Sequence, residues 1–254
     1  MALVKTQAIV LRTLKFGETS RIATLYTRDL GRVTVMAKGA RAARSPFGSA
    51  LNLLVRNEVV FAHKEGRDLQ TLTRAELVHE HRGFERDPLR LAHAAVAGEL
   101  TERVALGEEP VGELFDLVSR ALDRFDAAPA VRLPTALWLF ELQLADLLGY
   151  LPRLDACAAC GGPLGGSGVM GLVEGGLLCR ACGTGRDGTT RLSPGSVEIL
   201  RLLVAGGWEP GSRVTPLREQ AREIDDALLT YLSIHALGRR GLRSVRVLRE
   251  LRRS

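Results

Sequence analysis

The residues with the clearest chemistry are four cysteines arranged as two pairs. Two residues separate the cysteines of each pair, and eighteen separate the pairs: Cys157, Cys160, Cys179 and Cys182. Thiolates at this spacing can point at one ion from a tight turn, and two such pairs complete a tetrahedron around Zn²⁺. Four thiolates fill the coordination shell, so we expect a structural and not a catalytic zinc ion. A redox-active pair is the alternative, but two copies without a thioredoxin-like context argue against it.

Glycines flank both cysteine pairs. Gly161, Gly162 and Gly183 are predicted to supply the positive backbone angles that metal-binding turns often need. The surrounding segment, residues 153–185, is rich in glycine and poor in aliphatic residues. It cannot form a core by itself, so we expect an insert that the metal holds in shape.

Positive charge is concentrated at the two ends of the chain. The 254 residues include 35 lysines and arginines against 29 acids, a net charge of +6. Residues 1–44 hold nine basic and two acidic residues, and residues 239–254 hold seven arginines and one glutamate. Two basic ends favour a polyanion such as nucleic acid as partner. An arginine-rich protein can, however, be basic without binding one.

The N-terminal cations lie on or between predicted strands and are candidates for a nucleic-acid surface. Arg32 and Lys38 share the outward face of one strand, and Gly39 lets the next turn approach another backbone closely. The full candidate set is Arg12, Lys15, Arg21, Arg32, Lys38, Arg41 and Arg44. A solvated barrel face is the alternative. Since this half of the chain offers few aromatic residues, binding should depend on phosphate charge more than base stacking, with strong salt sensitivity.

The C-terminal arginines form a possible second basic surface. Several are spaced by three or four residues, so a helix would gather them on one face. They are Arg239, Arg240, Arg243 and Arg246, followed by Arg249, Arg252 and Arg253. A second DNA surface, a protein-docking edge and a solvated helix face all remain open.

No catalytic constellation is visible. The chain lacks a phosphate-binding Gly-rich loop, a nucleophile elbow and the motif of zinc deaminases. His79, Glu80 and His81 are interpreted as a surface linker, because adjacent residues on a strand alternate faces. His63, His93 and His235 are isolated in the sequence. We expect the protein not to be an enzyme.

Five short β-rich segments occupy the first eighty residues. They are residues 4–14, 21–27, 32–38, 51–61 and 69–77. Hairpin-length connections indicate a small barrel, although strand counting cannot separate an OB-type barrel from an SH3-like one.

Helical periodicity follows. Residues 134–148 are apolar nearly all round, so this helix is predicted to be buried. The expected helices span residues 87–106, 111–125, 134–148, 195–205 and 215–237, and a short one closes the chain. The chain is therefore predicted to have an α+β fold with three parts: a barrel at 1–80, a helical domain at 81–152 and 186–254, and the zinc insert at 153–185. No apolar run is long enough to cross a bilayer and the start lacks the features of a secretory signal, so we expect a cytoplasmic protein.

The sequence resembles the RecO family of bacterial DNA repair and recombination mediators. The resemblance is carried by residues 8–41, which end in Lys38-Gly39-Ala40-Arg41, by Ser45-Pro46-Phe47 and by the cysteine pairs, and it covers essentially the whole chain. It implies an N-terminal OB barrel, a helical domain and a zinc-binding insert. It also implies that Arg32, Lys38 and Arg41 belong to a DNA-binding surface, with the other barrel cations placed less securely.

The resemblance further implies function and partners. Members of the family bind single- and double-stranded DNA, anneal complementary strands, and act with RecR and RecF to help RecA load onto DNA coated by the single-strand-binding protein. Some dock the tail of that protein on the helical domain. The implied location is the cytoplasm, at the nucleoid. An RNA-binding OB accessory protein, a zinc-dependent nucleic-acid enzyme and a pure protein-interaction scaffold remain the alternatives.

Overall fold

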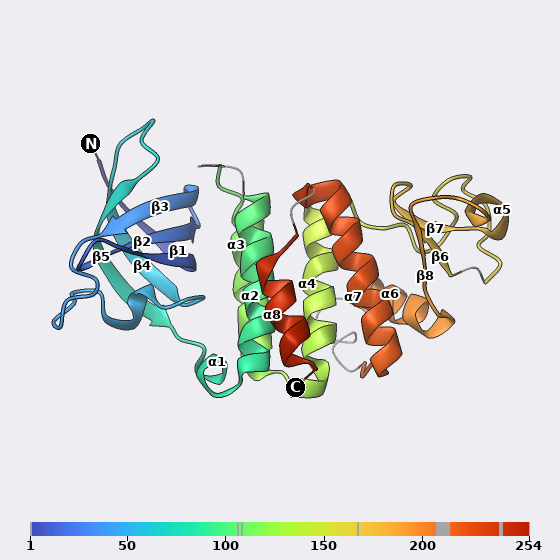
Figure 1. Ribbon diagram of the computed structural model, residues 1–254. Coiled ribbons are helices and arrows are strands. Elements are labelled where there is room, and N and C mark those ends of the chain that lie inside the picture. Colours follow the sequence, from blue (N-terminus) through green and yellow to red (C-terminus); the bar gives the residue numbers. More distant parts are fainter. Residues whose placement is uncertain are drawn as a thin grey trace. The chain divides into compact units, whose positions relative to one another are not determined.

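The computed structural model describes residues 2–105, 107, 109–166, 168–206, 214–238 and 241–253 (Figure 1). These residues form two compact units. One unit comprises residues 1–127 together with 244–254, and the other comprises residues 128–243. The chain therefore leaves the first unit, builds the second, and returns to the first. The division into three domains expected from the sequence stays a prediction.

Five strands close into a barrel in the first unit (Figure 1). They are β1 (Ala2–Phe16), β2 (Ser20–Thr27), β3 (Gly31–Ala37), β4 (Arg56–His63) and β5 (Gln70–His79). The ring order is β1-β2-β3-β5-β4, with β3 parallel to β5 and the other pairs antiparallel. This Greek-key order is that of the OB-type barrel expected from the resemblance.

Alternating burial explains why the strands form. In β3, Val33, Val35 and Ala37 are buried in the barrel, as predicted, while the residues between them are partly exposed. The same inward positions on the other strands complete the barrel core. Period-two burial of small and β-branched residues is what a half-buried strand requires.

The prediction of a strand over residues 51–61 was wrong in its first half. A 3-10 turn covers Gly48–Leu51, and β4 begins only at Arg56. Leu54 has a positive φ of 63° and is buried, and its N–H donates to the carbonyl of Val10 at 2.8 Å. Leu53, which lies within the predicted strand, is 41% exposed. The apolar residues are buried here by a turn locked onto β1, which periodicity alone does not reveal.

Four helices accompany the barrel in the first unit. They are α1 (Arg82–Arg86), α2 (Pro88–Val104), α3 (Gly112–Ala127) and α8 (Arg243–Leu251). The predicted start of α2 is confirmed, since the Asp87 carboxylate accepts from the backbone N–H of Leu89 at 2.9 Å and Pro88 occupies the first turn. The apolar stripe of α3 is buried and includes Leu114, Leu117, Val118, Ala121 and Leu122. Leu106, the expected end of α2, lies outside the described residues.

The last helix, α8, is attached to α2. The Ser244 hydroxyl donates to Glu99 Oε2 at 2.7 Å, and Leu248 is buried. The Arg252 guanidinium donates to Nε2 of the fully buried His93 at 2.9 Å, while Nδ1–H of His93 donates to the carbonyl of Leu89. His93 must therefore be neutral to accept from an arginine.

This contact predicts acid sensitivity. Burial and then the charge of Arg252 lower the pKa of His93 to about 3, against an ordinary value of 6.5; Asp87 and Arg90 also face it. The unfolded chain then binds more protons between these two pH values, so stability is full above pH 6.5 and falls as the pH drops. We expect the free energy of unfolding to fall by about 2 kcal/mol from this site between pH 7 and pH 5. Urea unfolding at both pH values should show a smaller drop in His93→Gln, and an equal drop in both proteins would contradict the assignment.

The second unit packs three helices with the cysteine segment. The helices are α4 (Leu133–Leu147), α6 (Pro194–Gly206) and α7 (Arg218–Leu232), preceded by a 3-10 turn at Ala130–Arg132 and followed by a π-helical turn at Ser233–Leu237. As predicted, α4 is largely buried. Its Trp138 is fully buried and donates from Nε1 to Asp225 Oδ1 at 2.7 Å. One apolar core joins these helices to the cysteine segment.

The predicted start of the last long helix at Thr215-Pro216 was wrong. The helix α7 begins at Arg218, where the Gln220 side chain accepts from the backbone N–H of Leu217 at 2.9 Å. Gln220 therefore caps the helix at Leu217, two residues after the start that Thr215-Pro216 indicated.

The cysteine segment forms a small sheet of its own. Its elements are β6 (Val169–Gly171), β7 (Gly176–Leu178), β8 (Thr189–Arg191) and the short helix α5 (Arg180–Gly183), with the sheet order β7-β6-β8. Met170, Leu177 and Leu178 bring the sheet into the shared core. Within the described ranges, no helix is long and apolar enough to cross a membrane.

Candidate metal centre and nucleic-acid interface

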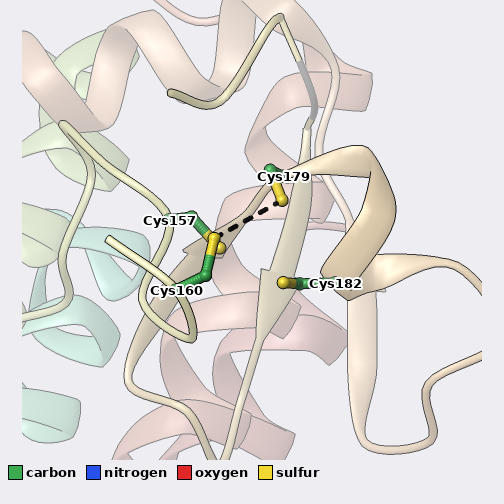
Figure 2. A group of neighbouring side chains, drawn as sticks. All are labelled: Cys157, Cys160, Cys179 and Cys182. Carbon is green, nitrogen blue, oxygen red and sulfur yellow. Dashed lines mark hydrogen bonds between the residues drawn. The ribbon is translucent and has the colours of Figure 1, made fainter. Parts of the chain in front are cut away.

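The four cysteines converge in the second unit (Figure 2). Cys157 and Cys160 lie in the loop before β6, and Cys179 and Cys182 lie at the start and within the single turn of α5. All four sulfur atoms are within 4.8 Å of one another, and Cys160 Sγ lies 3.9 Å from Cys179 Sγ. In a tetrahedron with bonds of about 2.3 Å, the sulfurs are roughly 3.8 Å apart. The cluster therefore fits a thiophilic ion of zinc size.

Backbone hydrogen bonds shape the first knuckle. The N–H of Cys157 donates to the carbonyl of Gly162 at 2.9 Å, and the N–H of Gly161 donates back to the carbonyl of Cys157 at 2.8 Å. Gly161 has a φ of 74°, as predicted, because the turn passes through the left-handed region.

The prediction that Gly162 and Gly183 also adopt positive angles was wrong, since neither does. Gly183 is needed for a different reason. A Cβ there would meet Val169 Cγ1 at 3.0 Å, so the absence of a side chain lets α5 pack on β6.

Electrostatics make the cluster favourable for a cation. The backbone N–H of Cys179, followed by those of Cys160 and Ala159, lowers the pKa of Cys157 to about 6. Hydrogen bonds to the neighbouring thiols, first that of Cys179, raise the pKa of Cys182 to about 12. One thiolate therefore forms readily, but a full set of negative sulfurs needs a compensating dication. The four cysteines lie close enough together to hold one metal ion.

Four of the seven candidate DNA contacts gather at one end of the barrel. Lys15 and Arg21 are register partners beside the β1–β2 turn, and Arg21 also pairs with Ala37, next to Lys38. The loop after β3 folds onto the same turn, since Arg41 donates from its backbone N–H to Thr19 and from its side chain to Gly17. We name the set Lys15, Arg21, Lys38 and Arg41 the hairpin patch. Three of its side chains are exposed and that of Arg21 is half-buried.

The structure does not bring the remaining barrel candidates into this patch. Arg12 Nη1 lies 3.7 Å from the Glu102 carboxylate of α2, and Arg32 Nη1 donates to the Glu102 carbonyl at 2.9 Å. Both side chains therefore contact the end of α2. Arg44 is exposed in the loop that follows β3.

Aromatic side chains contribute little surface to the barrel. Tyr26, Phe47 and Phe61 are buried, and Tyr26 packs against Phe115 of α3. Phe16, at the end of β1 beside the hairpin patch, is 48% exposed.

The C-terminal arginines in and just after α8 differ in exposure. Arg243, Arg246, Arg249 and Arg253 are exposed, while Arg252 is half-buried against His93. Arg239 and Arg240 lie outside the described residues.

Sequence reasoning missed a second cluster of ligand-type side chains. His79, at the end of β5, and His81, just before α1, both point at Asp123 of α3. The interpretation of residues 79–81 as a surface linker was wrong for His81, which is buried, and both rings face the same carboxylate. The partner Asp123 comes from a helix more than forty residues later, and nothing local in the sequence indicates it.

Comparison with known proteins covers nearly the whole chain. The family model described as recombination protein O N terminal matches residues 1–81, and the one described as recombination protein O C terminal matches residues 85–245. A DNA repair protein RecO from Anaeromyxobacter dehalogenans is 37% identical over 93% of this chain and 92% of its own. Proteins of the same name from Pelobacter propionicus and Rubrobacter xylanophilus are each 38% identical, over 97% and 93% of this chain and 96% and 92% of theirs.

Proposed function

The chain belongs to the RecO family of DNA repair proteins, and from this premise we propose that it is a non-enzymatic recombination mediator that binds single- and double-stranded DNA and anneals complementary strands. Annealing requires two mutually repelling strands to be held close together. A protein can do this by screening phosphate charge, without a bond being made or broken.

The observation that carries this proposal is the hairpin patch. Lys15, Arg21, Lys38 and Arg41 come from two strands and a loop, yet they converge on one end of the barrel. Within the part of the chain that the structure describes, none of the four forms a salt bridge with a carboxylate. Glu18 lies in the same turn but pairs with none of the four, so the patch keeps an excess of positive charge, which a sugar-phosphate strand needs.

The other barrel cations and the C-terminal arginines have supporting roles in this proposal. Arg44 lies outside the hairpin patch but is exposed in the loop after β3, so it adds to the positive field. Arg12 and Arg32 contact the end of α2 and contribute to the field at longer range. The exposed arginines of α8, with Arg239 and Arg240, assist with the second strand or with RecR.

The metal is Zn²⁺ and its role is structural. Cys157, Cys160, Cys179 and Cys182 would hold it and leave no coordination position for substrate. The segment it organises shares a core with α4, α6 and α7, so the ion stabilises the helical part and takes no part in chemistry.

The cellular setting follows from the family. The protein acts in the cytoplasm at the nucleoid, with RecR and RecF, to load RecA on DNA coated by the single-strand-binding protein. In functional terms, residues 1–80 are the DNA-binding domain, residues 81–152 and 186–254 the helical domain, and residues 153–185 the zinc insert.

Salt dependence tests the proposal. If about six phosphates are neutralised on a single strand, the logarithm of affinity should fall with the logarithm of salt concentration at a slope of roughly −4. Fluorescence anisotropy of a labelled oligonucleotide with the whole chain, from low to physiological salt, measures this slope. An affinity that does not change with salt concentration would contradict the mediator proposal and favour a protein-interaction scaffold. Preference for an RNA of the same length would favour an RNA-binding accessory, and turnover of the labelled DNA would favour an enzyme.

A further inference from the structure

Three ligand-type atoms converge in the first unit, which does not contain the four cysteines. Nε2 of His81 lies 3.1 Å and Nε2 of His79 lies 3.6 Å from Oδ1 of Asp123, and all three groups fall within 4.8 Å of one another. Ligands bonded to one tetrahedral metal at about 2.1 Å are roughly 3.4 Å apart. The spacing of the two nitrogens around the carboxylate oxygen is therefore close to that of a coordination shell.

The surrounding structure holds two of these groups in place. The side chain of His81 is 1% exposed, and its ring stacks on Phe84 with 4.9 Å between the ring centroids. The ring of His79 meets that of His81 edge-on at 4.7 Å. Asp123 lies on α3, one of the longest helices of the unit. Ligands on packed elements need little reorganisation when an ion binds.

Arg56 forms a salt bridge with the carboxylate of Asp123. Its Nη2 lies 2.9 Å from Oδ1 of Asp123, and metal-bound carboxylates are usually hydrogen-bonded in this manner by a second group. A carboxylate oxygen has two lone pairs, so Oδ1 can bind an ion with one of them while the other accepts from the Arg56 guanidinium. The positive charge of Arg56 lowers affinity for any cation, and the two imidazole ligands favour zinc-class ions over magnesium or calcium.

The cluster is open to solvent on one side. The side chains of His79 and Asp123 are 43% and 45% exposed. Asp123 and Arg56 also line a cavity of about 350 Å³ between the barrel and α3, whose other walls include Arg28, Arg120 and Phe115. Three protein ligands leave a fourth position that faces solvent, where water or an anion can bind.

We propose that His79, His81 and Asp123 form a second metal site, selective for zinc-class divalent ions and separate from the four cysteines. A metal there joins the end of β5 and the start of α1 to α3. It therefore clamps the barrel to its neighbouring helix, and it stabilises the first unit by mass action.

Cobalt titration separates this site from the cysteines. The chain is first loaded with one equivalent of Zn²⁺, which fills the cysteine site and which Co²⁺ does not displace, since zinc binds more tightly. Co²⁺ is then added and followed by visible absorption. The expected result is a second equivalent whose spectrum lacks a thiolate charge-transfer band, together with a raised unfolding temperature of the barrel unit.

Matched variants decide the assignment. His79→Ala, at an exposed ring, and Asp123→Asn should each lower the affinity for this second ion at least tenfold. His63→Ala removes a half-buried histidine of β4 outside the cluster and should leave it unchanged. Binding of one ion per chain in the wild type, or a second ion that persists in His79→Ala, would overturn the proposal. Circular dichroism of each variant confirms that the fold is retained.

Discussion

Reversing two charges of the hairpin patch, in Lys38→Glu/Arg41→Glu, lowers the affinity for single-stranded DNA by about 100-fold at moderate salt. Each residue provides a charge-assisted contact worth roughly 1.5 kcal/mol, so two together amount to about 3 kcal/mol. The salt slope should become shallower by about 1.4, because two fewer phosphates are neutralised. Strand annealing should fall in parallel, measured by energy transfer between complementary labelled oligonucleotides.

A matched double variant controls for total charge. Arg82→Glu/Arg86→Glu places the same change on exposed positions of α1, outside the hairpin patch. It should retain most of the affinity and the slope of the wild type. Unchanged annealing in Lys38→Glu/Arg41→Glu at moderate salt would remove the hairpin patch from the mechanism. Equal losses in both double variants would mean that net charge, and not this surface, drives binding.

Loss of a single cysteine ligand should strongly lower the thermal stability of the second unit. Cys160→Ser should release the metal and lower the unfolding midpoint of the second unit by about 10 °C, since roughly 3 kcal/mol corresponds to such a shift. Cys160 is exposed, so the substitution opens no cavity. The effect reaches the helices because Met170, Leu177 and Leu178 belong to the core that α4, α6 and α7 share.

Calorimetry and metal analysis together measure this effect. Ala159→Ser alters the adjacent exposed residue without removing a ligand, and it should keep both the metal and the midpoint. Treatment of the wild type with a strong chelator should reproduce the destabilisation of Cys160→Ser. A Cys160→Ser protein that lacks zinc and still unfolds at the wild-type temperature would show that the module folds without its ion.

Local patterns were sufficient for some features. The buried face of β3 and the cap at Asp87 each depend on residues within a few positions, where alternation or a short polar side chain decides the conformation. The spacing of Cys157 and Cys160 belongs to the same class, because one turn brings both sulfurs to an ion. These features could be predicted since their physics is contained in a short segment.

Other features depend on segments that meet only in the folded chain. Strand alternation assigned Arg32 to the outer face of the barrel, but it could not show that Glu102 of α2 contacts both Arg32 and Arg12. The turn at Leu54 depends on Val10, and the histidine cluster depends on Asp123. In each case a distant residue supplies the deciding contact, and a single sequence contains no local sign of it.

The return of the chain to its first unit determines the order in which the two units can finish folding during translation. Residues 128–243 are contiguous and include the whole zinc-type cluster, whereas the barrel unit also needs Ser244 and Arg252 for its contacts with Glu99 and His93. Domains usually fold as units, beginning at the N-terminus during translation. Here the ribosome delivers every part of the later unit before the last helix of the earlier one, so the nascent barrel unit remains unfinished until its neighbour is complete.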